Sequence, residues 1–171
     1  MIEEVVEVGL AVERRALQGQ WGGHAWRPIS IFASAPEVAA WTSLGVGANF
    51  ARYYAGAYPI QLFSTDTANY RDNLASGVPK LWVVLRDAGA ETSIEIALIT
   101  ADPAEGEAST EAGNNTVETI DMPPEIAGVV AAFIAAHHTE RAVFKRQRDG
   151  KPMREHWRDG RRGGNGSGDA T

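Results

Sequence analysis

The chain has 171 residues, of which 44% are apolar, and a net charge of −6, which together fit one globular domain plus a tail. It contains no cysteine, which excludes disulfides, thiolate metal sites and a cysteine nucleophile. The first residues lack the features of a signal peptide, and the longest apolar run, at 126–136, is too short to span a bilayer, so we predict a soluble, cytoplasmic protein without membrane contact.

Two strands are predicted in the first part of the chain. Apolar side chains at every second position of 6–12 predict a half-buried strand, with Glu7 and Glu13 facing water. A loop that contains several glycines separates this strand from a second one at 27–33. Pro28 has no N–H to donate, so we expect it at the start of that strand or on a sheet edge.

The middle of the chain alternates helical and extended patterns. Residues 36–44 are predicted to form one or two helical turns, because two apolar side chains there share a helical face. An extended segment is expected at 52–64, with a bend or bulge near Gly56. A short helix is predicted near 65–76, since Gly77 and the proline after it end the pattern.

The second half of the chain contains the most apolar patterns. Residues 81–85 are apolar at every position, which predicts a central strand buried on both faces. Its partner is expected at 93–100 and a short last strand at 117–120. The strongest helix is predicted from Pro123 to about His138, with one apolar stripe along it.

These elements predict an α+β fold, in which a curved, mostly antiparallel sheet of about five or six strands packs on the long C-terminal helix. One domain is expected over 1–149. Residues 150–171 are polar, basic and rich in glycine, so they are predicted to form a disordered tail. Basic residues outnumber acidic ones by nine to four from Arg141 onward, whereas acidic residues dominate 1–140 by eighteen to seven. This asymmetry favours an electrostatic contact made by the tail.

The loop at 21–28 combines aromatic and basic side chains with backbone freedom. Trp21, His24, Trp26 and Arg27 are candidates for binding a partner, because tryptophan and arginine anchor many protein interfaces. The alternative is a structural loop, with Trp26 turned inward before the second strand and His24 simply exposed. Trp21 is the better candidate for an anchor, since it lies between Gln20 and a glycine.

His137 and His138 are the only weak candidates for metal ligands. Adjacent histidines on a helix point about 100° apart, so one ion cannot easily take both. A hydrogen-bonded, partly buried imidazole at the end of the helix is the favoured interpretation, and no ligand spacing in the chain predicts a metal site. We therefore predict neither a metal nor a cofactor.

The basic segment that begins at Phe144 is a second candidate for partner binding, through Phe144, Lys145, Arg146 and Arg148. An aromatic residue beside basic ones suits an anchored contact with an acidic partner. Binding to a phosphate backbone and a merely solvated tail are the alternatives. The acidic body would repel a duplex, so nucleic acid is not the expected partner.

The sequence contains none of the common catalytic or phosphate-binding motifs, and no pair of carboxylates is spaced for acid–base work, so we predict that the chain is not an enzyme. Several motifs instead agree, in order, with one family. They are Val12-Glu13-Arg14-Arg15, Trp26-Arg27-Pro28, Pro59-Ile60-Gln61-Leu62-Phe63, Tyr70-Arg71-Asp72-Asn73-Leu74, Met122-Pro123-Pro124 and His137-His138. Over roughly 5–150 the chain resembles the bacterial family of unknown function DUF3305.

Members of that family are often encoded beside molybdenum-dependent formate dehydrogenases, and the resemblance therefore implies accessory or maturation work. The leading hypothesis is a non-catalytic protein that binds a protein partner, such as a formate dehydrogenase subunit or an assembly factor. A small-molecule-binding domain or small enzyme with a pocket near His24 is the alternative. Nucleic-acid binding through the basic tail is a further alternative.

Overall fold

The computed structural model describes residues 1, 3–89 and 93–139. The chain divides into two units, Met1–Thr139 and Glu140–Thr171, and only the first belongs to the described part. The basic segment at 144–148, the tail predicted at 150–171 and the boundary between domain and tail therefore lie outside the described residues. The described part contains seven strands and three α-helices and is an α+β structure, as predicted.

Four strands form the first antiparallel sheet, in the order β2-β1-β4-β3. β1 (Glu3–Ala16) lies between β2 (His24–Phe32) and β4 (Phe50–Phe63), and β3 (Thr42–Val46) is the outer strand beside β4. The predicted strands near 6–13, 27–33 and 52–64 are therefore confirmed. β1 is longer than its pattern indicated and pairs along most of its length with β4.

A bulge in β4 decides which side chains face the interior. The register with β1 shifts between Leu10 and Ala11, so that β4 carries an extra residue there, next to Gly56 at a φ of 130°. The bend predicted near Gly56 is thus one bulge within a continuous strand. As a result Tyr54 packs against Phe32 on the outer face of the sheet, while Tyr53, its neighbour, packs against the core on the inner face.

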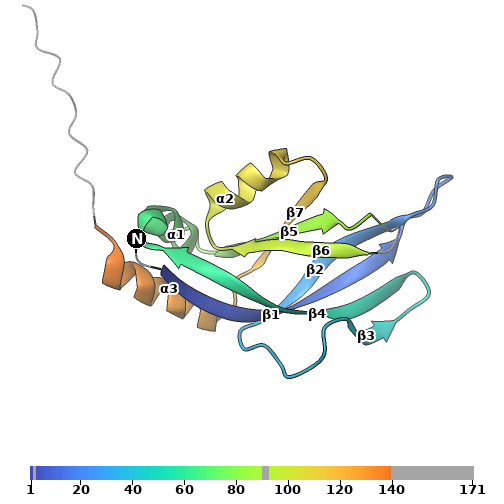
Figure 1. Ribbon diagram of the computed structural model, residues 1–171, viewed down its shortest axis with the longest axis horizontal. Helices are drawn as coiled ribbons and strands as arrows, with labels where there is room; N and C mark the ends of the chain where they lie inside the picture. The colour runs from blue at the N-terminus through green and yellow to red at the C-terminus, as the bar shows by residue number, and fades with distance from the viewer. Residues whose placement is uncertain (2, 90–92, 140–171) are drawn as a thin grey trace, which may run out of the picture. The chain divides into compact units, whose positions relative to one another are not determined.

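The prediction of helical turns over 36–44 is wrong. This segment crosses the outer face of the first sheet as an irregular loop and then becomes β3 at Thr42 (Figure 1). The close approach is possible because Gly9 has no side chain: a Cβ there would lie 3.0 Å from Cδ of Pro36. Trp41 has a φ of 66°, and this left-handed backbone ends any right-handed turn before β3.

Three strands form a second antiparallel sheet, in the order β6-β5-β7. β5 (Lys80–Asp87) is central between β6 (Ile94–Thr100) and β7 (Asn115–Asp121), as predicted from its continuous apolar run. Val83 and Val84 point to opposite faces of β5, and each is at most 1% exposed. The predicted single sheet of five or six strands is therefore two sheets, because the chain turns into a helix after β4 and starts a new sheet with β5.

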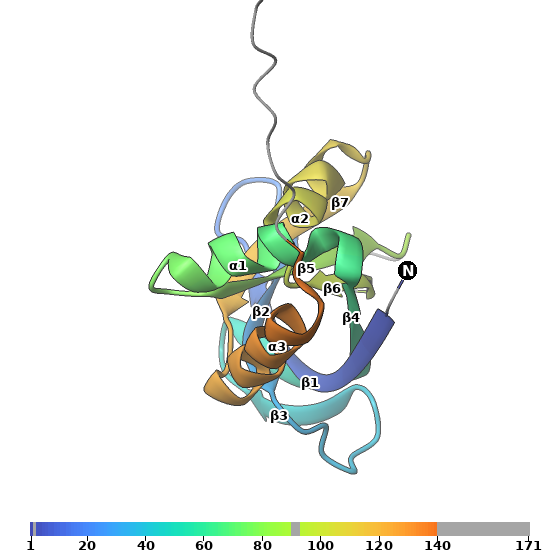
Figure 2. The same cartoon turned by 90° about the vertical axis from the view of Figure 1, so that its left-hand side faces the viewer.

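Three helices cover the sheets. α1 (Thr67–Ala75) follows the short 3-10 turn Ser64–Asp66, which confirms the helix predicted near 65–76. α2 (Pro103–Ala108) lies against the second sheet (Figure 1). Gly106 of α2 packs closely on Trp82 of β5. α3 (Pro124–His137) lies beside α1, at the end of the sheets away from the β1–β2 hairpin (Figures 1 and 2).

One apolar core joins both sheets and α3. Ile126, Val130 and Phe133 form the predicted stripe of α3 and are at most 2% exposed. They belong to the same cluster as Leu10 of the first sheet and Leu81 of the second. The sequence predicted that this helix covers one face of a single sheet. In the structure, α3 instead packs its apolar side chains into the core shared by the two sheets.

Two residues of the motif at 70–74 hold α1 to its neighbours. Asn73 is 5% exposed and its side chain makes three hydrogen bonds: it donates to the carbonyls of Lys80 and Ala101, and accepts from the Lys80 N–H. Tyr70 accepts a hydrogen bond from the Phe63 N–H through its hydroxyl, and burial raises its pKa to about 12. This motif is therefore structural.

Candidate binding surface

An open cleft of about 720 Å³ lies between β2 and the second sheet. His24 and Trp26 line it from β2, and Arg86 and Asp87 line it from β5. The remaining lining residues are Ala25, Leu85, Gly89, Ser93, Ile94, Gly113, Asn114, Asn115, Thr116 and Glu118. The walls thus combine hydrogen-bonding groups of both charges with a few apolar side chains.

An aromatic cluster stands beside this cleft. Trp26, Trp41 and Tyr53 have ring centroids 5.9 to 6.2 Å apart, and the guanidinium of Arg14 lies 5.8 Å from the centroid of Trp26. Trp26 and Tyr53 meet because they flank β1 on the inner face of the first sheet. Trp41 directly precedes β3, on the other side of β4, and its backbone is left-handed at a φ of 66°.

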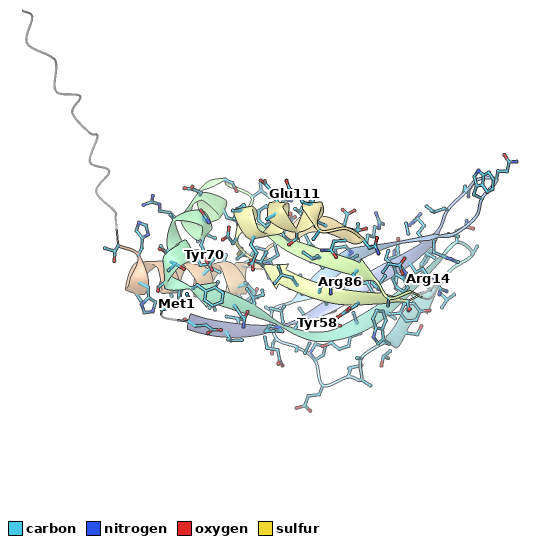
Figure 3. All side chains as sticks on the ribbon, turned by 45° about the horizontal axis from the view of Figure 1, so that its top comes forward. Met1, Arg14, Tyr58, Tyr70, Arg86 and Glu111 are labelled. Carbon is cyan, nitrogen blue, oxygen red and sulfur yellow. The ribbon has the colours of Figure 1, made fainter. Side chains whose placement is uncertain are left out.

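A second cavity of about 300 Å³ opens next to the aromatic cluster. It is lined by Arg14, Trp26, Trp41, Tyr53, Ser93 and Ile94. Trp26, Ser93 and Ile94 line both cavities, so the Trp26 ring forms part of a wall between a polar cleft and a mainly aromatic cavity. Arg14 and Arg86 mark this end of the sheets in Figure 3, away from Tyr70.

The backbone at Trp41 is strained. A non-glycine residue at a φ of 66° costs on the order of 1–2 kcal/mol, because its Cβ approaches the following carbonyl. Trp41 is 40% exposed, so more than half of its surface is buried, and this burial offsets the strain. Strain of this kind is more common at functional sites than elsewhere.

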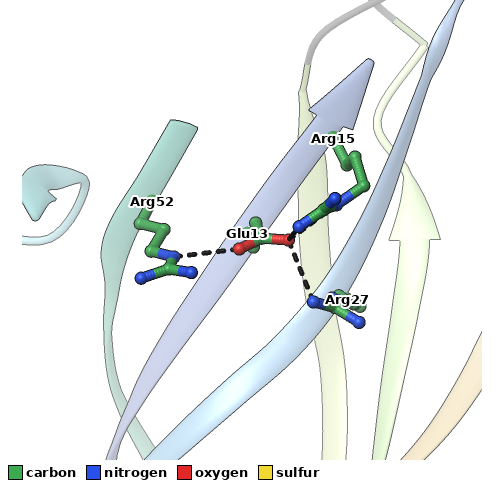
Figure 4. A network of polar contacts seen from close by, with 4 residues as sticks. All are labelled: Glu13, Arg15, Arg27 and Arg52. Carbon is green, nitrogen blue, oxygen red and sulfur yellow. Dashed lines mark hydrogen bonds and ion pairs between the residues drawn. The ribbon is translucent and has the colours of Figure 1, made fainter. Parts of the chain in front are cut away.

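On the outer face of the same sheet, three arginines converge on Glu13 (Figure 4). Arg52 donates from Nε to Oε2 at 2.9 Å, Arg27 donates from Nη2 to Oε1 at 3.1 Å, and Arg15 donates from Nε to Oε1 at 3.1 Å. The register produces this arrangement, since Glu13 is paired with Arg27 of β2 on one side and with Arg52 of β4 on the other.

The prediction that Glu13 faces water is wrong, because its side chain has no exposed surface. The hydrogen bond from Arg52 lowers the pKa of Glu13, burial opposes this shift, and the interactions with Arg15 and Arg27 add to it. Three ion-pair partners cover the Glu13 carboxylate, and the side chains of these arginines remain about half exposed.

The candidate residues of the loop at 21–28 separate in space. Trp21 is 94% exposed in the turn between β1 and β2, as expected for an outward anchor, while Trp26 packs partly against the core. His24 lines the cleft with Trp26, but Arg27 points to the opposite face and binds Glu13. Consecutive residues of a strand alternate between its two faces, so these four side chains do not form one surface.

His138 uses both ring nitrogens for hydrogen bonds. Nε2 lies 3.1 Å from Nη1 of Arg71, and Nδ1 lies 3.0 Å from Oγ1 of Thr67. A guanidinium can only donate, so Nε2 accepts the hydrogen bond from Arg71. His137 packs on the Phe133 ring, with centroids 4.7 Å apart. Neither histidine lines the cleft.

The described residues that line the cleft provide charged, hydrogen-bonding and aromatic side chains. Over 1, 3–89 and 93–139, no group of three or more His, Cys, Asp or Glu side chains could hold a metal ion. Ser93 and His24 both line the cleft, but among the described residues neither forms a hydrogen bond that would pair a nucleophile with a base. In the same part of the chain, no helix has the length and hydropathy needed to cross a bilayer.

Sequence analysis missed most of this surface. Arg52, Trp41 and Tyr53 come from segments far from the loop at 21–28, and no spacing along the chain connects them. Arg86 and Asp87 follow the predicted strand at 81–85, and no pattern in the sequence marks them as part of a site. The one available signal was the pair Glu13 and Arg27, which lie in two predicted neighbouring strands, but their register was unknown.

The fold and the site define a class of α+β protein with two antiparallel sheets, a shared core and an open cleft beside an aromatic cluster. The chain belongs to the family described as "Protein of unknown function (DUF3305)", whose model matches residues 7–148. This match confirms the family resemblance. No curated protein and no solved structure gives a significant match to the chain.

Proposed function

We propose that the chain is a non-catalytic binding protein, which holds a segment of a protein partner at the cleft and the aromatic cavity. The observation that carries this proposal is the partly exposed cluster of Trp26, Trp41 and Tyr53 beside two cavities. Tryptophan, tyrosine and arginine contribute most of the energy at many protein interfaces, because they bury a large area and also form hydrogen bonds.

The aromatic cavity suits one apolar side chain of a partner, and the cleft suits the polar chain that continues from it. Trp26 contacts both spaces, so it would anchor the boundary between them. Trp21 adds an exposed ring on the hairpin between β1 and β2. The left-handed backbone of Trp41 supports a binding role, since strain at a non-glycine residue is more common at functional sites than elsewhere.

The finer part of the proposal concerns the identity of the partner. We propose that the partner is a subunit or an assembly factor of a molybdenum-dependent formate dehydrogenase. We also propose that the chain binds this partner in the cytoplasm. The family resemblance alone supports the choice of enzyme, and the chain's composition supports the location.

Co-purification tests this proposal. The tagged full-length chain should recover a formate dehydrogenase component from native cells, and the variant Trp41→Gly should recover severalfold less. Glycine adopts the backbone of Trp41 without strain, so this variant removes the ring without adding backbone strain. Val78→Ala is the control, because Val78 is an apolar residue of similar exposure outside both cavities. Recovery of unrelated proteins alone, or equal recovery by the three proteins, would contradict the proposal.

A small-molecule-binding site is the second candidate function. The volume of the cleft, about 720 Å³, lies within the range of ligand sites, and His24, Arg86 and Asn115 supply groups that would orient a ligand. A thermal-shift screen with nucleotides and molybdopterin-type ligands checks this candidate. A ligand at about 100 times its Kd should stabilise the fold by about 2.7 kcal/mol, and no shift across the panel would count against it.

A further inference from the structure

We propose that Arg15, Arg27 and Arg52 form a docking surface for an acidic, extended segment of the protein partner. This inference rests on the proposed function as a binding protein, but it uses the opposite face of the first sheet from the aromatic cluster. It names the chemistry of the partner: a row of carboxylates that meets a row of guanidiniums.

The first argument is the local charge. Three arginines surround one glutamate, which leaves a surplus of two positive charges within one short stretch of three neighbouring strands. The remainder of 1–140 is acidic, so this surplus stands out from its surroundings. Like-charged neighbours with free donors attract an anion more strongly than scattered arginines do.

The second argument is the supply of unused hydrogen-bond donors. Each guanidinium has five N–H groups, and Arg27 and Arg52 each use one of them on Glu13. In the described part of the chain, neither forms another hydrogen bond, although Arg52 also lies over the Phe50 ring at 4.8 Å. The side chains of Arg15, Arg27 and Arg52 are 46–55% exposed, so the remaining N–H groups can reach a ligand.

The third argument is pre-organisation. An exposed arginine normally loses considerable side-chain entropy when it binds a carboxylate. Here Glu13 already holds the three side chains in place, and its lowered pKa keeps it ionised at neutral pH. The arginine side chains therefore lose less conformational entropy when a partner binds, which is how pre-organised sites gain affinity.

Access to the row is open from one edge of the sheet. Gly45 of β3 is paired with Arg52, and β3 is the outer strand. A Cβ at Gly45 would meet no atom within 4 Å, so the space beside this strand partner of Arg52 is open. A carboxylate on a segment beside β3 can therefore reach the guanidinium of Arg52.

An acidic peptide fits this surface better than the other anions. Arg15, Arg27 and Arg52 line neither the cleft nor the aromatic cavity, so a small anion such as phosphate would find little enclosure beside them. A nucleic acid needs a longer positive track than three arginines, and the acidic body would repel it. An extended segment can place successive carboxylates along the flat row and bind through several charge-assisted hydrogen bonds.

Fluorescence anisotropy with a labelled short peptide of alternating glutamate and serine tests the inference on the full-length chain. The peptide should bind, and its affinity should fall as salt is added. Arg15→Gln, Arg27→Gln and Arg52→Gln should each weaken binding about two- to fivefold, the range for partly exposed ion pairs. Lys80→Gln is the matched control, because it removes one partly exposed positive charge far from the row.

Each other outcome of this experiment overturns the inference. No binding of the glutamate peptide at low salt would do so, as would equal weakening by the Lys80→Gln control, which would indicate an effect of net charge. Competition by inorganic phosphate alone, or tighter binding of a single-stranded oligonucleotide, would assign the surface to a different anion. Three arginine variants are used so that one that fails to fold leaves two to decide.

The result is independent of the cellular partner, because the peptide is synthetic. If the peptide does not bind but the formate dehydrogenase component is still recovered, the proposed function stands and the docking surface fails. If the peptide binds in the predicted way and no such component is recovered, the surface stands and the choice of partner fails.

Discussion

Replacing Asn73 with alanine should destabilise the fold more than any other single substitution on α1 outside its apolar side chains. The Asn73 side chain spans the Lys80 N–H, the Lys80 carbonyl and the Ala101 carbonyl at 2.8 to 2.9 Å. It thereby ties α1 to the start of β5 and to the chain just after β6. Alanine removes all three hydrogen bonds at once.

The expected loss follows from the hydrogen-bond count. A hydrogen bond contributes about 1 kcal/mol net, so three contribute roughly 3 kcal/mol. Ala101 is fully buried, and its carbonyl would have no access to water, whereas Lys80 is partly exposed and could recruit a water. We therefore expect the free energy of unfolding to fall by about 3 kcal/mol, and Tm by about 6–12 °C for a domain of this size.

Urea unfolding followed by tryptophan fluorescence measures this loss, since Trp82 lies on β5 close to the site. Asp72→Ala is the control, because Asp72 is exposed on the same helix and its replacement should change stability by less than about 0.5 kcal/mol. Asn73→Asp keeps the acceptor for Lys80 N–H but sets a carboxylate against two carbonyls, so it should be at least as damaging as alanine. A loss below about 1 kcal/mol for Asn73→Ala would refute the reasoning.

Two further predictions concern Glu13 and the glycines of the helices. Glu13→Gln should lower the free energy of unfolding by roughly 1–3 kcal/mol at pH 7. Because the pKa of Glu13 is lowered in the fold, urea titrations should show the stability difference between the native chain and the variant shrink as the pH falls through that pKa. A difference that stays constant with pH would contradict this reasoning. Gly106→Ala should destabilise the fold, since the added Cβ would lie 2.6 Å from Cβ of Trp82. Gly128→Ala should stabilise the fold by up to about 1 kcal/mol, because a Cβ there would meet no atom within 4 Å. Thermal unfolding should therefore show a lower Tm for the first variant and a higher Tm for the second, and changes in the same direction would contradict the packing argument.

The sequence predicted those elements whose signal is local. The continuous apolar run at 81–85 fits only a strand covered on both sides, and β5 is such a strand. The stripe of Ile126, Val130 and Phe133 has helical period, and α3 buries these three side chains. In each case the spacing of apolar residues along the segment indicated both the type of element and the side that is buried.

The errors have a common physical cause. At 36–44 a helical spacing of apolar residues was outweighed by contacts with another strand, namely the space left by Gly9 and the left-handed backbone at Trp41. Glu13 was assigned to water because an isolated strand shows only alternation, and it cannot show that two arginines occupy the strands on either side.

By itself the sequence determined the class of fold, the strands and helices with clear periodicity, and the family to which the chain belongs. Only the tertiary structure decided the division into two sheets, the partners of Glu13, and the meeting of Trp26 with Trp41 and Tyr53. The reason is that periodicity reports how each residue is buried relative to its neighbours in the chain. Which side chains from distant strands meet depends on register, and a single bulge, such as the one beside Gly56, exchanges the faces of every residue beyond it.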